Sequence, residues 1–184
     1  MDSTILSKDE QMRFLGLLYD NLKKQQTEIH SFDMALLFRA SEHNFKGEEF
    51  HNHCNDKGST VTIIQNEHDI VFGGYLSKSW KSGTFFPDSN AFLYTIRPDI
   101  MYIPFNDGCE NDQWASFEGG GPVFGSGCDI YISGYCNEKD TCYSLPRTFQ
   151  FDEEQIDPQK DYFQVIEYEV FSIKTNDSGN KIDV

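Results

Sequence analysis

The feature that most constrains the fold is a change of hydrophobic period at Ser59. Beyond it, short β-branched and aromatic runs alternate with turn residues, a pattern typical of strands. Residues 60–75 are predicted to form a hairpin. The other predicted strands are 91–96, 101–105, 129–133 and 162–174, of which the last is the longest. Pro104 predicts an edge position or a strand end for 101–105, because proline cannot donate a ladder hydrogen bond.

Helices are predicted in the first third of the chain. Ser7 and Glu10 form a capping box. It precedes apolar residues at helical spacing, which predict a helix packed on the core: Met12, Leu15, Leu18, Tyr19 and Leu22. A shorter helix is predicted for 47–54, and residues 35–40 fit either a strand or a buried helical turn. The predicted fold class is therefore mainly β with peripheral helices (α+β): a two-sheet antiparallel β-sandwich flanked by short helices.

Length and charge limit the organisation and the partners. The 184 residues predict a single domain, 1–174, and a flexible C-terminal tail, 175–184. Thirty Asp and Glu against fifteen Lys and Arg give a net charge of −15, which argues against nucleic acid and anionic lipid as partners. A local basic patch around Lys78, Lys81 and Arg97 would be an exception to this argument.

No membrane segment is expected. The longest apolar stretches, such as 14–19, fall far short of the roughly 20 residues that a spanning helix needs. Residues 1–4 lack the positive charge of a signal peptide. We therefore expect no direct membrane insertion and a cytoplasmic location, with the nucleus or the cytosolic face of acidic organelles as alternatives.

The five cysteines are odd in number and contain no C-x-x-C pair, so free thiols are the default expectation. Three of them, Cys128, Cys136 and Cys142, are close in sequence, and the alternative is an oxidation-sensing pair among them.

Motifs for a metal or a cofactor are incomplete. On a helix, His51 and His53 point about 200° apart and cannot share an ion. The acidic loop 105–112 lacks the ligand order of an EF-hand. The glycine-dense segment 118–127 lacks both phosphate-binding spacings, and no G-x-S-x-G is present. We expect neither a metal ion nor a cofactor.

The predicted last strand carries two carboxylates, Glu167 and Glu169. Unless a bulge resets the phase, they share a face with four apolar residues: Phe163, Val165, Phe171 and Ile173. Two neighbouring carboxylates could act as a general acid–base pair. The alternative, which we favour, is structural: they accept hydrogen bonds from glycine-rich loop amides or pair with Arg39 or Arg97.

An ordered set of segments resembles the TLDc domain, the module of eukaryotic oxidation-resistance proteins. The segments are LLFRAS at 36–41, TVTII at 60–64, VFGGY at 71–75, PDSNAFL at 87–93, GPVFG at 121–125, DIYI at 129–132 and FQVIEYEVF at 163–171. The likeness runs from about residue 5 to residue 174. Two places depart from the family pattern: the acidic stretch 149–154, and Asp161 where glycine is usual. A surface used for a partner could differ there.

The resemblance implies a two-sheet sandwich with flanking helices, protection from oxidative damage and, in several relatives, binding to the vacuolar proton-pumping ATPase. No enzymatic mechanism is established for the family. By its pattern, six positions are expected to matter, the glycines through fold integrity: Gly73, Gly74, Gly121, Gly125, Glu167 and Glu169.

These observations favour a non-catalytic protein-interaction module in oxidative-stress defence, acting through the vacuolar ATPase or another protein. The alternative is an enzyme, either a hydrolase or a thiol-based peroxide-consuming protein, that uses the Glu167/Glu169 pair or a cysteine.

Overall fold

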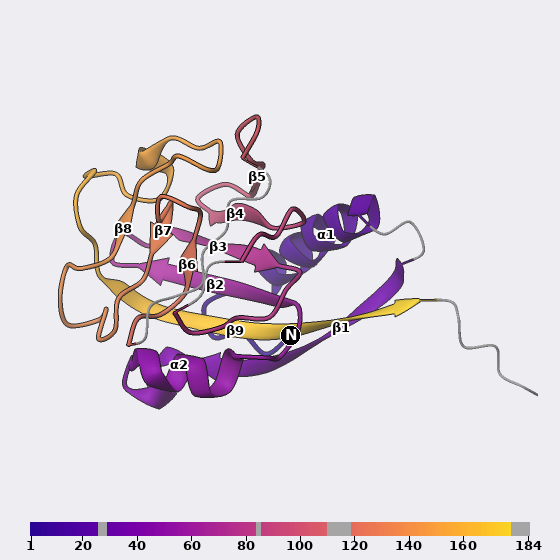
Figure 1. Cartoon of the computed structure of the whole chain (residues 1–184), viewed down its shortest axis with the longest axis horizontal. Coiled ribbons are helices and arrows are strands. Elements are labelled where there is room, and N and C mark those ends of the chain that lie inside the picture. The colour runs from indigo at the N-terminus through magenta and orange to yellow at the C-terminus, as the bar shows by residue number, and fades with distance from the viewer. Residues whose placement is uncertain (26–28, 84–85, 110–118, 178–184) are drawn as a thin grey trace, which may run out of the picture.

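The fold consists of two antiparallel sheets with helices outside them, as the computed structural model shows (Figure 1). It describes residues 1–25, 29–83, 86–109 and 119–177. The larger sheet has the order β1-β9-β2-β3-β4-β5 and the smaller one β6-β7-β8. This arrangement confirms the predicted fold class.

The helices are α1 (Lys8–Gln25) and α2 (Gly47–Cys54), with short 3₁₀ turns η1 (Ala40–His43) and η2 (Glu153–Gln155). The strands are β1 (Ile29–Arg39), β2 (Thr60–Asn66), β3 (Val71–Leu76), β4 (Phe92–Arg97), β5 (Met101–Ile103), β6 (Val123–Phe124), β7 (Ile130–Tyr131), β8 (Tyr143–Ser144) and β9 (Val165–Asp177). None of the described helices is long and apolar enough to cross a membrane.

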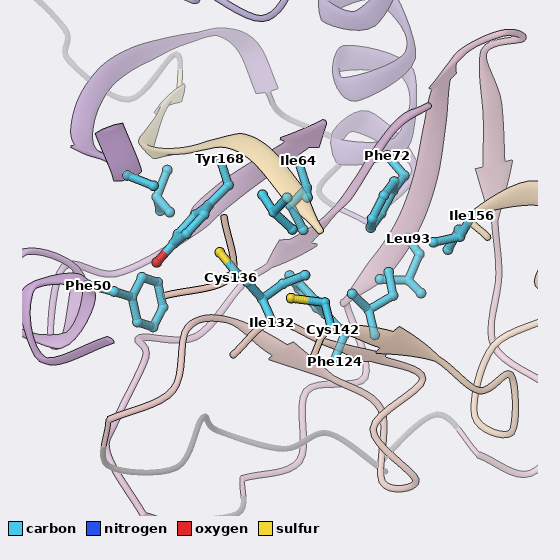
Figure 2. Close-up of a cluster of buried hydrophobic side chains, with 14 of the residues drawn as sticks. Phe50, Ile64, Phe72, Leu93, Phe124, Ile132, Cys136, Cys142, Ile156 and Tyr168 are labelled. Carbon is cyan, nitrogen blue, oxygen red and sulfur yellow. The ribbon is translucent and has the colours of Figure 1, made fainter. Parts of the chain in front are cut away.

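Both faces of the large sheet are covered. One face packs against α1 and the N-terminal segment, through residues such as Phe14, Val61 and Tyr94. The other packs against α2 and the small sheet, and Figure 2 shows this second cluster around Phe124 and Tyr168. Because β3 is buried on both faces, its sequence VFGGYL contains no polar side chain except the Tyr75 hydroxyl. The neighbouring β2 is also buried on both faces, although it includes Thr60 and Thr62.

The capping box of α1 is confirmed. The Ser7 hydroxyl accepts from the Glu10 amide at 3.3 Å, and the Glu10 carboxylate accepts from the Ser7 amide at 2.8 Å. The expected burial of Met12 is wrong, because its exposed fraction is 66%. The buried stripe instead follows Phe14 and Leu18, and Met12 lies about 200° around the helix from Phe14.

Residues 35–40 are mainly strand: β1 runs from Ile29 to Arg39 and is longer than predicted. Its early part pairs with the end of β9, where Ile29 lies opposite Asp177. Residues 175–177 are therefore strand rather than tail, which corrects the predicted boundary. Residues 178–184 lie outside the described part of the chain.

The small sheet has two-residue strands, so the strand predicted for 129–133 shrinks to β7. The buried side chain of Asp129 adds hydrogen bonds next to these short strands. The Asp129 Oδ2 accepts three backbone N–H groups, from Arg147, Thr148 and Phe149, at 2.8, 2.7 and 2.9 Å. By contrast, 101–105 yields β5 at the edge of the large sheet, as Pro104 predicts.

Candidate functional site

Glu169 is fully buried in β9, at the centre of a polar network. Its Oε1 accepts from Arg39 Nε at 2.9 Å and from the amide and hydroxyl of Thr4 at 2.9 and 3.0 Å. Its Oε2 accepts from the Ser3 hydroxyl at 2.6 Å. Arg39 also donates to the Asp2 carbonyl oxygen at 2.9 Å. The carboxylate therefore fastens the N-terminal segment to the sheet.

Glu167 is half-buried, and its Oε1 accepts from the amides of Ser41 and Tyr168 at 3.1 and 3.0 Å. The structural interpretation is confirmed through one of its alternatives, the pairing with Arg39. Among the described residues, the donors to the two carboxylates come from the N-terminal segment, Arg39, Ser41 and Tyr168 instead of the glycine-rich loop.

Arg97 pairs elsewhere, with Glu10 at 2.9 Å and with Asp69. The hydrogen bond from Arg97 lowers the pKa of Glu10 to about 2. The arginine therefore ties β4 to the first turn of α1, on the side of the sheet where that helix packs.

A bulge before Glu167 changes which face the first residues of β9 occupy relative to the two glutamates. The register between β2 and β9 shifts between Gln65 and Asn66. As a result, Val165 joins the cluster on the small-sheet side, while Phe171 joins the opposite one. The exception that we made for a bulge therefore applies: Phe163 and Val165 lie on the face opposite to Phe171 and Ile173.

Two glycines of β3 allow close approach of neighbouring groups. A Cβ at Gly74 would lie 2.5 Å from the Phe124 ring, which packs there from β6. A Cβ at Gly73 would lie 1.8 Å from the Thr62 carbonyl oxygen, to which the Tyr94 hydroxyl donates at 2.6 Å. We propose that both positions act through fold integrity, since a side chain has no room at either.

The other two glycines flank β6. Gly125 has a φ of +82°, and a Cβ there would lie 2.0 Å from the Asp129 carboxylate. A Cβ at Gly121 would lie 3.2 Å from Ile132. We propose the same structural role for both, with the tighter requirement at Gly125.

All five cysteines are free, and three of them, Cys54, Cys136 and Cys142, are buried. Of the three close in sequence, the structure brings together Cys136 and Cys142, in the core shown in Figure 2. The hydrogen bond with Cys142 and burial raise the pKa of the Cys136 thiol, and burial raises that of Cys54. High pKa values disfavour the thiolate that reacts with peroxide.

The two histidines of α2 lie in different surroundings, as their spacing predicts. The His51 Nδ1 is 2.9 Å from Asn55 Oδ1, whereas the His53 ring packs 4.2 Å from the ring of His43.

Only part of the acidic loop is described, because residues 110–112 lie outside the described ranges. In the described part, the Asn106 side chain donates to the carbonyl oxygens of Arg147 and Phe149, at 2.6 and 3.2 Å. The loop is therefore tied to the small-sheet region by an amide.

A surface that the sequence did not reveal lies on the small sheet. We call Tyr131, Tyr143, Leu145 and Tyr162 the tyrosine surface. Tyr131 and Tyr143 face each other across β7 and β8 with stacked rings 5.1 Å apart. Tyr162 meets Tyr143 edge-on at 6.1 Å and has an exposed fraction of 58%.

A hollow of about 410 Å³ lies at this surface, lined by Tyr143, Leu145, Tyr162 and the charged residues Glu153, Lys160 and Asp161. Lys160 is already paired with Glu154 at 2.8 Å. Both departures from the family pattern therefore contribute an acidic residue to this hollow: Glu153 from the stretch 149–154, and Asp161.

A larger hollow, of about 660 Å³, is lined by residues that include Thr95, Arg97, Asp99 and Glu154. Since Arg97 is already engaged with two carboxylates, this hollow offers no unpaired arginine for an anionic ligand.

The chain is similar to known proteins over nearly all its described length. The family model for the TLDc domain matches residues 2–174. MTOR-associated protein MEAK7 from Homo sapiens is 25% identical over 162 residues, which are 77% of this chain and 35% of that protein. The Xenopus laevis protein of the same name is 34% identical over 76 residues, or 39% of this chain and 16% of that protein.

The chain belongs to the TLDc domain family. The matched regions span about a third, or less, of the length of these curated relatives.

Proposed function

We propose that this chain is a non-catalytic protein-interaction module. The observation that carries the proposal is the tyrosine surface, where partly exposed aromatic rings surround a hollow with acidic neighbours. Tyrosines are enriched among the residues that dominate binding energy at protein interfaces. The burial of Glu169 among structural donors supports the non-catalytic part of the proposal, since a general acid or base must reach its substrate.

The partner is a protein with a basic docking segment. Glu153 and Asp161 flank the aromatic rings, and the whole chain carries a net charge of −15. Complementary charge steers association and suppresses wrong partners. A lysine or arginine beside an apolar side chain would match the acidic neighbours and the aromatic rings together.

The finer proposal is a role in oxidative-stress defence through the vacuolar proton-pumping ATPase, from the cytoplasmic side. Its support is the TLDc family membership. The name of the relatives, MTOR-associated protein, offers a second protein assembly as an alternative partner.

The test is binding of the purified catalytic sector of the vacuolar ATPase to the immobilised chain. Tyr162→Ala is expected to weaken binding at least about tenfold, as removal of an aromatic anchor does. The matched control is Met12→Ala, because Met12 is also a large exposed side chain, at 66% against 58% for Tyr162, but lies on α1. Equal affinity for the wild type and Tyr162→Ala, or no binding at all, would contradict the proposal.

A further inference from the structure

A cluster of three possible metal ligands lies where η1 meets α2. His43 is the last residue of η1, and Glu49 and His53 are one turn apart on α2. One ligand atom from each lies within 4.8 Å of the other two. All three side chains are partly exposed, with fractions of 25%, 37% and 37%, so an ion can reach them from solvent.

The orientation of His53 is fixed by a hydrogen bond. Its Nδ1 lies 2.8 Å from the backbone carbonyl oxygen of Glu49. Because a carbonyl can only accept, Nδ1 must carry the proton, and the lone pair of the neutral ring is on Nε2. Histidines that bind metals usually donate their other nitrogen to a carbonyl or carboxylate in this way.

The His43 side chain packs against a buried aromatic residue of β1. Its ring stacks on Phe38, with centroids 4.9 Å apart and planes 15° apart, and Phe38 itself is only 1% exposed. The next two residues, Asn44 and Phe45, both have positive φ, at 51° and 53°. This left-handed turn reverses the chain and brings His43 beside α2, at a cost in backbone strain that often marks functional sites.

We propose that His43, Glu49 and His53 bind a zinc-class divalent cation. Two imidazoles and one carboxylate are a donor set that suits zinc, whereas magnesium and calcium prefer oxygen ligands alone. The His43 Nδ1 is 4.0 Å from Glu49 Oε2, and one ligand atom of each residue lies within 4.8 Å of the other two. Metal–ligand distances of about 2.1 Å require ligand atoms about 3.4 Å apart, so rotations of the partly exposed side chains are needed to close the site.

Three protein ligands leave a fourth position for water or for a donor from a partner. The site therefore differs from the expectation of no metal, and it uses His53 with His43 instead of His51. It is also separate from the tyrosine surface, with which it shares no residue.

The test is titration of the metal-free, fully reduced chain with zinc by calorimetry and with cobalt by absorption. The wild type is expected to bind one equivalent, and neither magnesium nor calcium should compete. His43→Gln and His53→Gln should each weaken binding at least about tenfold. The matched control is His68→Gln, since His68 lies 3.7 Å from the Glu67 carboxylate, outside the cluster, and this variant should bind as the wild type does.

Because a variant could lose zinc binding by failing to fold, the site is also tested by NMR on the wild-type chain. Zinc should shift the imidazole NMR signals of His43 and His53 and leave those of His68 in place. The proposal is overturned if the wild type shows no saturable binding. It is also overturned if both glutamine variants bind zinc as tightly as the wild type does. It is also overturned by a thiolate-to-cobalt charge-transfer band, which would assign the ion to the cysteines.

Discussion

Glu169 and Tyr162 are seven residues apart in sequence, yet their exposure to solvent is opposite to what their side-chain types suggest. The charged side chain is 0% exposed, while the large aromatic one is 58% exposed. Glu169 is surrounded by donors from the N-terminal segment, whereas Tyr162 borders a hollow at the surface. The comparison teaches that in this domain a carboxylate is part of the scaffold and aromatic rings are available for contact.

The largest expected effect comes from removing the buried charge. Glu169→Gln should lower the free energy of unfolding by about 3–5 kcal/mol, because it leaves Arg39 without its buried partner. Urea denaturation measures the change. Glu167→Gln is the matched control, since its carboxylate is only half-buried, and it should cost less than about 1 kcal/mol. A Glu169→Gln protein as stable as the wild type would remove the structural role assigned to this residue.

The contact between the two sheets depends on Gly74. Gly74→Val should destabilise the domain by about 2–3 kcal/mol, because the new side chain overlaps the Phe124 ring. Thermal or urea denaturation would measure the loss. Gly16→Ala on α1 is the control: nothing lies within 4 Å of its added Cβ, and it should stabilise by about 0.5–1 kcal/mol. If both variants behaved alike, the close approach at Gly74 would not matter for stability.

The free energy of unfolding should also fall at low pH, because Glu10 becomes protonated. Its pKa falls from an ordinary value of 4.5 to about 2 in the folded state, chiefly through the hydrogen bond from Arg97. A folded-state pKa below the unfolded one gives stability that is present above about pH 4.5 and lost as the pH falls through about 2. After a discount for solvent screening, we expect a loss of about 1–2 kcal/mol. Glu10→Gln should flatten this part of the pH profile in urea denaturation, and an unchanged profile would contradict the assignment.

The smallest effect concerns thiol reactivity. In the native state, a thiol reagent such as DTNB should modify Cys109 and Cys128, which are partly exposed. Cys54, Cys136 and Cys142 should react only after denaturation, because burial and a raised thiol pKa disfavour attack at Cys54 and Cys136. Despite burial, the hydrogen bond from Cys136 lowers the pKa of the Cys142 thiol, so rapid reaction of Cys142 in the native state would favour the oxidation-sensing hypothesis.

The sequence predicts elements whose signal is local. The hairpin of β2 and β3 follows from β-branched runs around a turn, and the capping box from Ser7 and Glu10 alone. The phase of β9 could not be predicted, because the bulge depends on how β2 pairs with it. The strands β6 and β8 are two residues long, which is too short for a period to show in the sequence.

The candidate sites were harder to predict for a similar reason. Nothing in the sequence distinguishes an outward tyrosine such as Tyr162 from a core tyrosine such as Tyr168. The pairing of His43 with His53 depends on the left-handed turn at Asn44 and Phe45. Asp161 departs from the family pattern, and for that reason the sequence already indicated that a partner surface could differ there. The structure places Asp161 at the hollow beside the tyrosine surface.

Hydrogen–deuterium exchange of the chain, alone and bound to the catalytic sector of the vacuolar ATPase, tests the interaction-module account most directly. The account predicts slower exchange at residues 143–145 and 160–162 in the complex, with α1 unchanged. Protection confined to α1 and the N-terminal segment, with no change around Tyr143 and Tyr162, would contradict it.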